Sequence, residues 1–170
     1  MINELPTSRS AKFNLVTAEE SQVSGPILSL DLGLKRVGVA VSDPSLVAIR
    51  RLEPLRRSNW KRLLLDVSDL IRRFDAQAVV IGWPLRLDGT AGAAARGAQE
   101  IAEKFARSLE LPVFLQDERL TSAEAEERLR ADGYKTKELA ALIDSESAAI
   151  ILRDFIVGRQ QRTPVSRPLN

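Results

Sequence analysis

The chain has 170 residues, enough for one domain with a single hydrophobic core, and its net charge is only +2. It contains no Cys and no His, which excludes disulfides, most zinc sites, and catalysis by a Cys nucleophile or a Ser-His-Asp triad. Its chemistry must therefore use carboxylates, Lys, Arg, hydroxyls or a hard cation, and carboxylate ligands suit Mg²⁺ or Mn²⁺.

The two ends of the sequence differ from the middle in composition. Residues 1–25 mix charged and polar residues without a continuous apolar run, so they predict a flexible N-terminal arm rather than a signal peptide. Residues 158–170 hold basic residues and two prolines, and they predict a basic flexible C-terminal tail. No apolar run approaches the ~20 residues of a membrane span. We expect one domain over residues 26–157, located in the cytoplasm.

The first three predicted strands form a meander. Ile27–Asp31 and Val37–Val41 are short apolar runs joined by a turn that contains Gly33, which predicts a β-hairpin. A third strand is expected around Ala48–Leu55. Because the connections are short, neighbouring strands of this meander should be antiparallel.

The rest of the chain alternates helices with buried strands. Helices are expected where apolar residues recur every 3.6 positions, and strands where apolar runs are short and rich in β-branched residues. The first helix is capped by Ser58 and extends to Phe74, and a strand follows at Ala78–Gly82. The second helix extends from about Gly92 to Leu109, and the next strand is Pro112–Leu115. A short helix then begins at the capping box Thr121–Glu124 and ends at Gly133, and the last helix extends from about Thr136 to Val157. This order predicts an α/β fold: a mixed five-stranded sheet, made of the three-stranded antiparallel meander plus parallel strands, with helices on both faces.

Acidic residues at two strand ends are candidate catalytic groups. Asp31 ends the first strand directly before a turn. Ligands collect at such strand ends in open α/β sheets, although an Asp in this place also stabilises turns without any catalytic role. Asp117 and Glu118 end another strand, where a catalytic role and a merely solvated strand end are both open.

Asp144 is the third acidic candidate, and it lies on the last predicted helix. At 100° per residue it shares a helix face with apolar residues, whereas Glu146 falls on the opposite side. The apolar residues on the Asp144 face are Ala148, Ile151 and Phe155. A carboxylate that faces the sheet needs a partner, either a metal ion shared with Asp31 or an Arg.

Basic residues accompany these acids in the sequence. Gly33 permits a tight turn and places Lys35 and Arg36 beside Asp31, as candidate phosphate-binding residues. A larger basic cluster extends from Arg50 to Arg73. Its members are Arg50, Arg51, Arg56, Arg57, Lys61, Arg62, Arg72 and Arg73. Such clusters are typical of surfaces that contact nucleic acid, and also of ordinary solvated surfaces.

Four segments of the chain, in the same order, resemble the YqgF/RuvX family. They are Leu30–Asp43, Val79–Gly92, Asp117–Ser122 and Ile143–Leu152. The resemblance extends over residues 27–157. This family is described both as Holliday junction resolvases and as pre-16S rRNA nucleases. It implies an RNase H-like fold with acidic residues on the first strand, in the Asp-Glu-Arg segment and on the last helix.

On this sequence the resemblance implies a metal-dependent nuclease that processes the 5′ end of pre-16S rRNA in the cytoplasm. The implied catalytic residues are Asp31, Asp144 and either Glu118 or Asp117, with Asp31, Glu118 and Asp144 holding Mg²⁺ or Mn²⁺. Substrate contacts are expected from Gly33, Lys35, Arg36, Arg119 and Thr121. The expected partner is nucleic acid, with pre-16S rRNA favoured over branched DNA and no membrane contact. A monomer and a homodimer are both open.

Three other functions are compatible with the sequence. A junction-resolving DNA nuclease has the same fold and requires a dimer, because four-way junctions are two-fold symmetric. A non-catalytic nucleic-acid-binding module would keep the basic surface without turnover. An ATP-dependent phosphotransferase also uses an Asp-x-Gly hairpin, but it needs a second domain to close over ATP, and this chain is too short for one.

Overall fold

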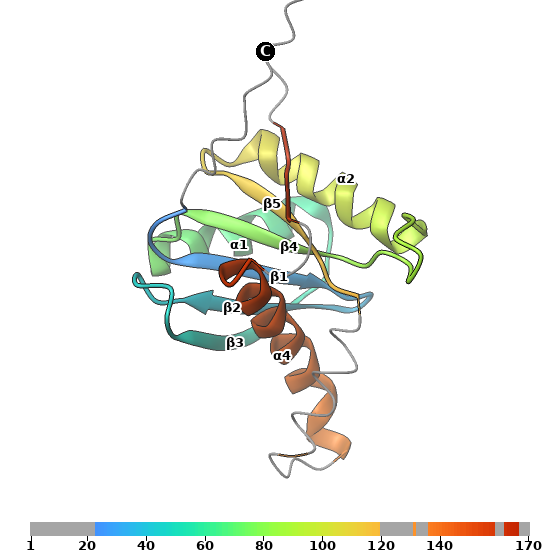
Figure 1. Cartoon of the computed structure of the whole chain (residues 1–170). Helices are drawn as coiled ribbons and strands as arrows, with labels where there is room; N and C mark the ends of the chain where they lie inside the picture. Colours follow the sequence, from blue (N-terminus) through green and yellow to red (C-terminus); the bar gives the residue numbers. More distant parts are fainter. Residues whose placement is uncertain (1–22, 120–130, 132–135, 159–161, 167–170) are drawn as a thin grey trace, which may run out of the picture.

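The computed structural model describes residues 23–119, 131, 136–158 and 162–166, with the side chains of the last helix described from Ser145 onwards (Figure 1). Its centre is a six-stranded sheet in the order β3-β2-β1-β4-β5-β6. The strands are β1 (Ile27–Leu32), β2 (Arg36–Ser42), β3 (Ile49–Arg56), β4 (Ala78–Trp83), β5 (Val113–Asp117) and β6 (Arg162–Pro164). The five predicted strands are confirmed, and β6 is a sixth that the sequence analysis missed.

The pairing directions follow from the connections. β1, β2 and β3 form the predicted antiparallel meander. β1, β4 and β5 are parallel to one another, as expected for strands joined through helices. β6 adds to the outer edge of β5 as an antiparallel strand.

The missed strand β6 lies inside the segment predicted as a basic tail. Its three residues include Pro164 and have no apolar pattern, so nothing local marks them as a strand. The open edge of β5 determines the pairing instead: Thr163 pairs with Leu115, and the Val165 N–H donates to the Val113 carbonyl at 2.9 Å. Val165 also packs against the hydrophobic core.

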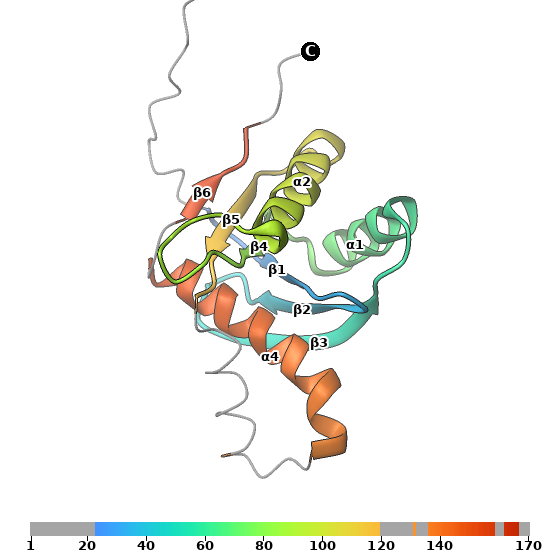
Figure 2. The same ribbon diagram turned by 90° about the vertical axis from the view of Figure 1, so that its right-hand side faces the viewer.

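Helices cover both faces of the sheet, as predicted (Figure 2). α1 (Trp60–Phe74) and α2 (Ala93–Ser108) lie on one face, and α4 (Thr136–Ile156) lies on the other. Ser58 was wrongly predicted as the cap of α1. The cap is Asn59, whose side chain accepts a hydrogen bond from the Arg62 N–H at 3.0 Å, because the helix starts one residue later than the sequence suggested. The predicted short helix from Thr121 to Gly133 lies outside the described residues.

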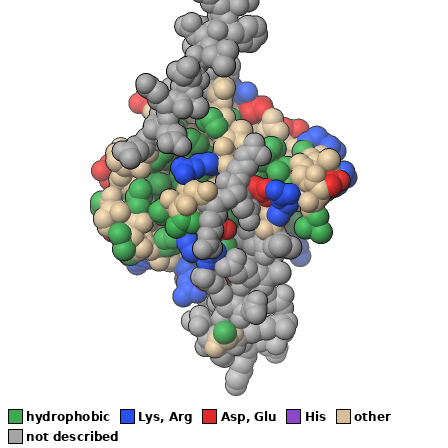
Figure 3. Space-filling model, in the orientation of Figure 1, with side chains coloured by type: hydrophobic (Ala, Val, Ile, Leu, Met, Phe, Trp, Pro, Cys, Tyr) green, Lys and Arg blue, Asp and Glu red, His purple; other side chains and the backbone are tan. Residues whose placement is uncertain are grey.

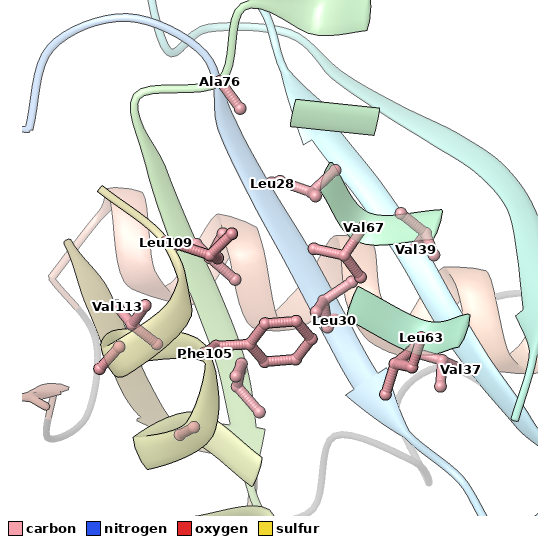
Figure 4. Packing of buried hydrophobic residues seen from close by; sticks show 14 of the residues in the cluster. Leu28, Leu30, Val37, Val39, Leu63, Val67, Ala76, Phe105, Leu109 and Val113 are labelled. Carbon is pink, nitrogen blue, oxygen red and sulfur yellow. The ribbon is translucent and has the colours of Figure 1, made fainter. Parts of the chain in front are cut away.

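Each face of the sheet has its own hydrophobic layer. Between the sheet and the α1 and α2 helices, Leu28 and Leu30 pack with Val67 and Phe105 (Figure 4). On the α4 side, Ile27 packs in a second cluster. The other members of that cluster are Ala40, Ala78, Val80, Ala148, Ile151, Leu152 and Phe155. Side chains therefore alternate between the two layers along each strand, which decides which strand-end residues face α4.

None of the helices in the described ranges combines the length and apolar character that crossing a bilayer requires.

Candidate active site

Three strand ends bring Asp31, Gly82 and Glu118 together. β1, β4 and β5 are parallel, so their carboxyl ends meet at one edge of the sheet. In the register, Leu30 is opposite Ile81 and Gly82 is opposite Gln116. Alternation from the α4-facing residues of each strand places Asp31, Gly82 and Glu118 on the α4 face. The site therefore lies between the sheet and α4.

Gly82 provides the space that the Glu118 carboxyl group occupies. A Cβ atom at Gly82 would lie 2.5 Å from Glu118 Oε2 and 2.8 Å from Ile151 Cδ1. Any larger residue would therefore displace either the carboxyl group or the α4 helix. Gly82 was not among the predicted site residues, although a glycine that ends a buried apolar strand is a recognised sign of close approach.

The environment of Glu118 disfavours its charged form. Burial raises the pKa of Glu118 from an ordinary value of 4.5 to about 9, and the negative charges of Asp31 and Asp117 add to the shift. The carboxyl group therefore holds a proton at neutral pH unless a cation offsets the desolvation and the repulsion. Two acidic groups close together at one half-buried site are a common arrangement at functional sites.

Asp117 has a different environment from its neighbour. Its carboxylate is almost fully buried and accepts hydrogen bonds from the Arg119 backbone N–H at 3.0 Å and from Arg119 Nε at 2.8 Å. As a neighbour of Glu118 in the chain, it points to the opposite face of the sheet. Of the two alternatives left open by the sequence, Glu118 is the one that shares a site with Asp31.

Arg119 connects Asp117 to the loop between β4 and α2. Its Nη2 lies 2.6 Å from Asp117 Oδ2, and its Nη1 donates to the Leu87 carbonyl at 3.3 Å. The hydrogen bond and charge of Asp117 raise the pKa of Arg119. Because this guanidinium is already paired, it holds the loop in place, and the predicted phosphate contact of Arg119 stays a prediction.

The turn between β1 and β2 presents the other predicted cations. Gly33 is required there because a Cβ would lie 2.7 Å from the Arg36 carbonyl oxygen. Lys35 is exposed and Arg36 is half-buried. Arg57, which the sequence analysis placed only in the basic cluster, fixes this turn: its Nη1 donates to the Gly33 carbonyl at 2.7 Å, and its backbone N–H donates to the Lys35 carbonyl at 3.0 Å.

Two predicted site residues fall outside what the structure describes. Thr121 lies outside the described residues, and Asp144 belongs to α4 with its side chain not described. The apolar stripe predicted for the Asp144 face is buried against the sheet, as expected. Within the described side chains, which exclude Asp144, no three acidic groups gather closely enough to hold a metal ion.

Glu146 corrects one expectation for α4. It was expected on the side away from the sheet, but it is buried and lies 2.7 Å from Arg51 Nη1 of β3. On the same stretch of helix, the Ser145 hydroxyl donates to the Leu52 carbonyl at 2.7 Å. The edge strand β3 thus covers a second side of α4. A helical-wheel projection of α4 does not reveal this contact, because it contains only residues of the helix itself.

Fold and site together define an RNase H-like protein with acidic groups at the carboxyl ends of its parallel strands. Its fold is similar to that of T. thermophilus RuvC in complex with a Holliday junction substrate, with a TM-score of 0.52 and 15% sequence identity over 82% of this chain and 99% of that chain. The family model described as RuvX, Holliday junction resolvase, matches residues 25–157, and the chain belongs to this family.

Two relatives match over most of their length, and both carry the name "Putative pre-16S rRNA nuclease". The protein of Anaeromyxobacter sp. (strain Fw109-5) is 41% identical over 132 residues, which are 78% of this chain and 96% of that protein. The protein of Koribacter versatilis (strain Ellin345) is 37% identical over 141 residues, which are 83% of this chain and 92% of that protein. The family resemblance seen in the sequence is thereby confirmed.

Proposed function

We propose that this chain is a metal-dependent nuclease that hydrolyses phosphodiester bonds at the 5′ end of pre-16S rRNA. The observation that carries the proposal is the meeting of Asp31 and Glu118 over Gly82, on one face of the sheet. Membership of the RuvX family and the names of the relatives support a nucleic-acid substrate and favour rRNA.

The residues present fit a hard divalent cation. Gly82 leaves the space that the Glu118 carboxyl group needs. Desolvation and the negative charge of Asp31 raise the pKa of Glu118, a shift that a bound cation would offset. Asp31 and Glu118 would hold Mg²⁺ or Mn²⁺ through oxygen atoms, with Asp144 as the third ligand that the family resemblance implies. Such a cation, when bound, lowers the pKa of an attacking water and stabilises the negative charge that develops at the scissile phosphate.

The other residues of the site bind substrate phosphates or hold the loop beside the carboxyl groups in place. Lys35 and Arg36, on a turn fixed by Arg57, neutralise backbone phosphates of the substrate near Asp31. The pair of Asp117 and Arg119 keeps the loop after β4 in place. The raised pKa keeps a proton on the Glu118 carboxyl group at neutral pH, and a bound cation would favour release of that proton.

The experiment that tests this function compares two substrates. The full chain is incubated with labelled pre-16S rRNA or with a four-way DNA junction, in Mg²⁺, Mn²⁺ or EDTA. We expect divalent-dependent cleavage of the rRNA, loss of cleavage in Asp31→Asn and Glu118→Gln, and retained cleavage in the surface control Asp69→Asn. Asp69 is an exposed acid on α1 that pairs with Arg72. Its substitution by Asn therefore removes the same charge as Asp31→Asn does, but at a distance from the site.

Each outcome of this comparison has a defined meaning. Undiminished cleavage by a folded Asp31→Asn protein would overturn the assignment of the site. Cleavage of the junction and not of the rRNA would overturn the substrate and support the junction-resolving alternative. Binding of either nucleic acid without cleavage under any metal condition would support a non-catalytic module.

A further inference from the structure

Some Lys and Arg side chains of the basic cluster between Arg50 and Arg73 are bonded to acidic or carbonyl groups of this chain, and others are not. On the α4 face, Lys and Arg side chains form several separate patches rather than one continuous field (Figure 3). The bonded cations are Arg51 to Glu146, Arg57 to the Gly33 carbonyl, Arg62 to Asp66 and Arg72 to Asp69. Arg56 is exposed, and among the described residues its guanidinium makes no hydrogen bond or ion pair.

A β-bulge determines the face on which Arg56 lies. Leu52 is opposite Val39 and Leu55 is opposite Val37, so three steps along β3 match two along β2. Both leucines pack against the α1 and α2 layer. Arg56, the residue after Leu55, therefore faces α4. In a regular strand it would share the face of Leu52, so the bulge turns this side chain towards the site.

Arg56 thereby forms a cross-strand pair with Arg36. The two residues are directly opposite each other on β3 and β2, on the face that also carries Asp31. Asp31 is opposite Gly38, two residues from Arg36 along β2. With strands about 4.8 Å apart and about 3.3 Å per residue, the Cα atoms of Arg56 and Asp31 are about 12 Å apart. A phosphate diester placed between the two residues is attracted by both guanidinium groups.

We propose that Arg36 and Arg56 form a second phosphate-binding site, which holds the backbone of the nucleic-acid substrate on the β3 side of the carboxyl groups. This inference rests on the proposed nuclease function. The distance of about 12 Å between Arg56 and Asp31 corresponds to about three to four nucleotides at the 3.4 Å axial spacing of one strand in a duplex. The site therefore acts on polynucleotides and is not reached by a small diester such as bis(p-nitrophenyl) phosphate.

The test measures binding in the full chain carrying Asp31→Asn, so that no cleavage intervenes. Affinity for a labelled single-stranded RNA is followed by fluorescence anisotropy over a series of salt concentrations. We expect Arg56→Ala to weaken binding about tenfold and to reduce the slope of log K against log salt by about 0.7, the value for one phosphate contact on a single strand. Arg56→Lys should keep the slope, because it keeps the charge.

Arg50→Ala is the matched control. Arg50 is exposed at the other end of the same strand, opposite the core residue Val41. Its side chain therefore lies on the α1 and α2 face, and the Ala substitution removes the same charge from the face opposite Arg56. We expect it to leave the affinity and the salt slope unchanged. Equal effects of Arg56→Ala and Arg50→Ala would overturn the proposal, as would a loss of hydrolysis of the small diester in Arg56→Ala made without Asp31→Asn.

The two proposals fail in different ways. If the natural chain cleaves neither nucleic acid but Arg56→Ala still lowers the salt slope, the phosphate site stands and the nuclease function fails. If the natural chain cleaves rRNA and Arg56→Ala binds as Arg50→Ala does, the function stands and the phosphate site fails.

Discussion

Replacing Glu118 by Gln tests whether this half-buried acid has a raised pKa that a cation offsets. Gln has nearly the same shape and fills the space above Gly82, but it cannot ionise. In the natural chain, burial and the charges of Asp31 and Asp117 raise the pKa of Glu118 to about 9. The substitution should therefore remove a pH-dependent loss of stability while preserving the packing against α4.

The size of the effect follows from the two pKa values. The folded chain binds the Glu118 proton more tightly than the unfolded chain, whose carboxyl group has the ordinary pKa of 4.5. The stability contributed by that proton is complete below pH 4.5, and it is lost progressively as the pH rises from 4.5 to about 9. Each pH unit costs about 1.4 kcal/mol, so the natural chain should lose up to about 4 kcal/mol by pH 7.5 when no divalent cation is present.

The assay is urea unfolding in EDTA between pH 5 and pH 9. We expect the free energy of unfolding of the natural chain to fall over this range relative to Glu118→Gln, and Mg²⁺ to restore it at the alkaline end in the natural chain alone. Glu110→Gln, at an exposed position after α2, is the control and should follow the natural chain. Parallel pH profiles of the natural chain and Glu118→Gln would refute a raised pKa at this position.

Three of the remaining predictions concern neighbours of Glu118, and one concerns a glycine of α2. Asp31→Asn should abolish cleavage in gel assays and leave nucleic-acid affinity, measured by anisotropy, within about twofold, because one hydrogen-bonding group replaces another. Gly82→Ala should cost about 1–3 kcal/mol in urea unfolding and reduce cleavage, because the added Cβ overlaps the Glu118 carboxyl group. Gly97→Ala, on α2 with no atom within 4 Å of the added Cβ, should stabilise the chain by up to about 1 kcal/mol. Asp117→Asn should cost about 2 kcal/mol and speed proteolysis of the loop after β4, yet retain the cleavage that Asp31→Asn loses.

The order of the helices and strands, and the reactive groups that they carry, can be predicted from the amino-acid sequence alone. Apolar residues at a period of 3.6 mark α1 and α2, and short β-branched runs mark β1 and β4, because these patterns follow from local backbone geometry. The absence of His and Cys left carboxylates, Lys, Arg, hydroxyls or a hard cation for the chemistry, and the place of Asp31 at a strand end made it a candidate. The family resemblance added the expectations of an acidic triad and of an rRNA substrate.

Tertiary structure alone decided which residues meet. Asp117 and Glu118 are equivalent in the sequence, and only the register of β5 against β4 turns Glu118 towards Asp31. β6 forms because β5 has an open edge, not because its own residues favour a strand. The close approach at Gly82 and the bulge that directs the Arg56 side chain likewise depend on neighbours distant in the chain. Periodicity is encoded within a few residues, whereas register, strand edges and close approach depend on elements that the local sequence does not contain.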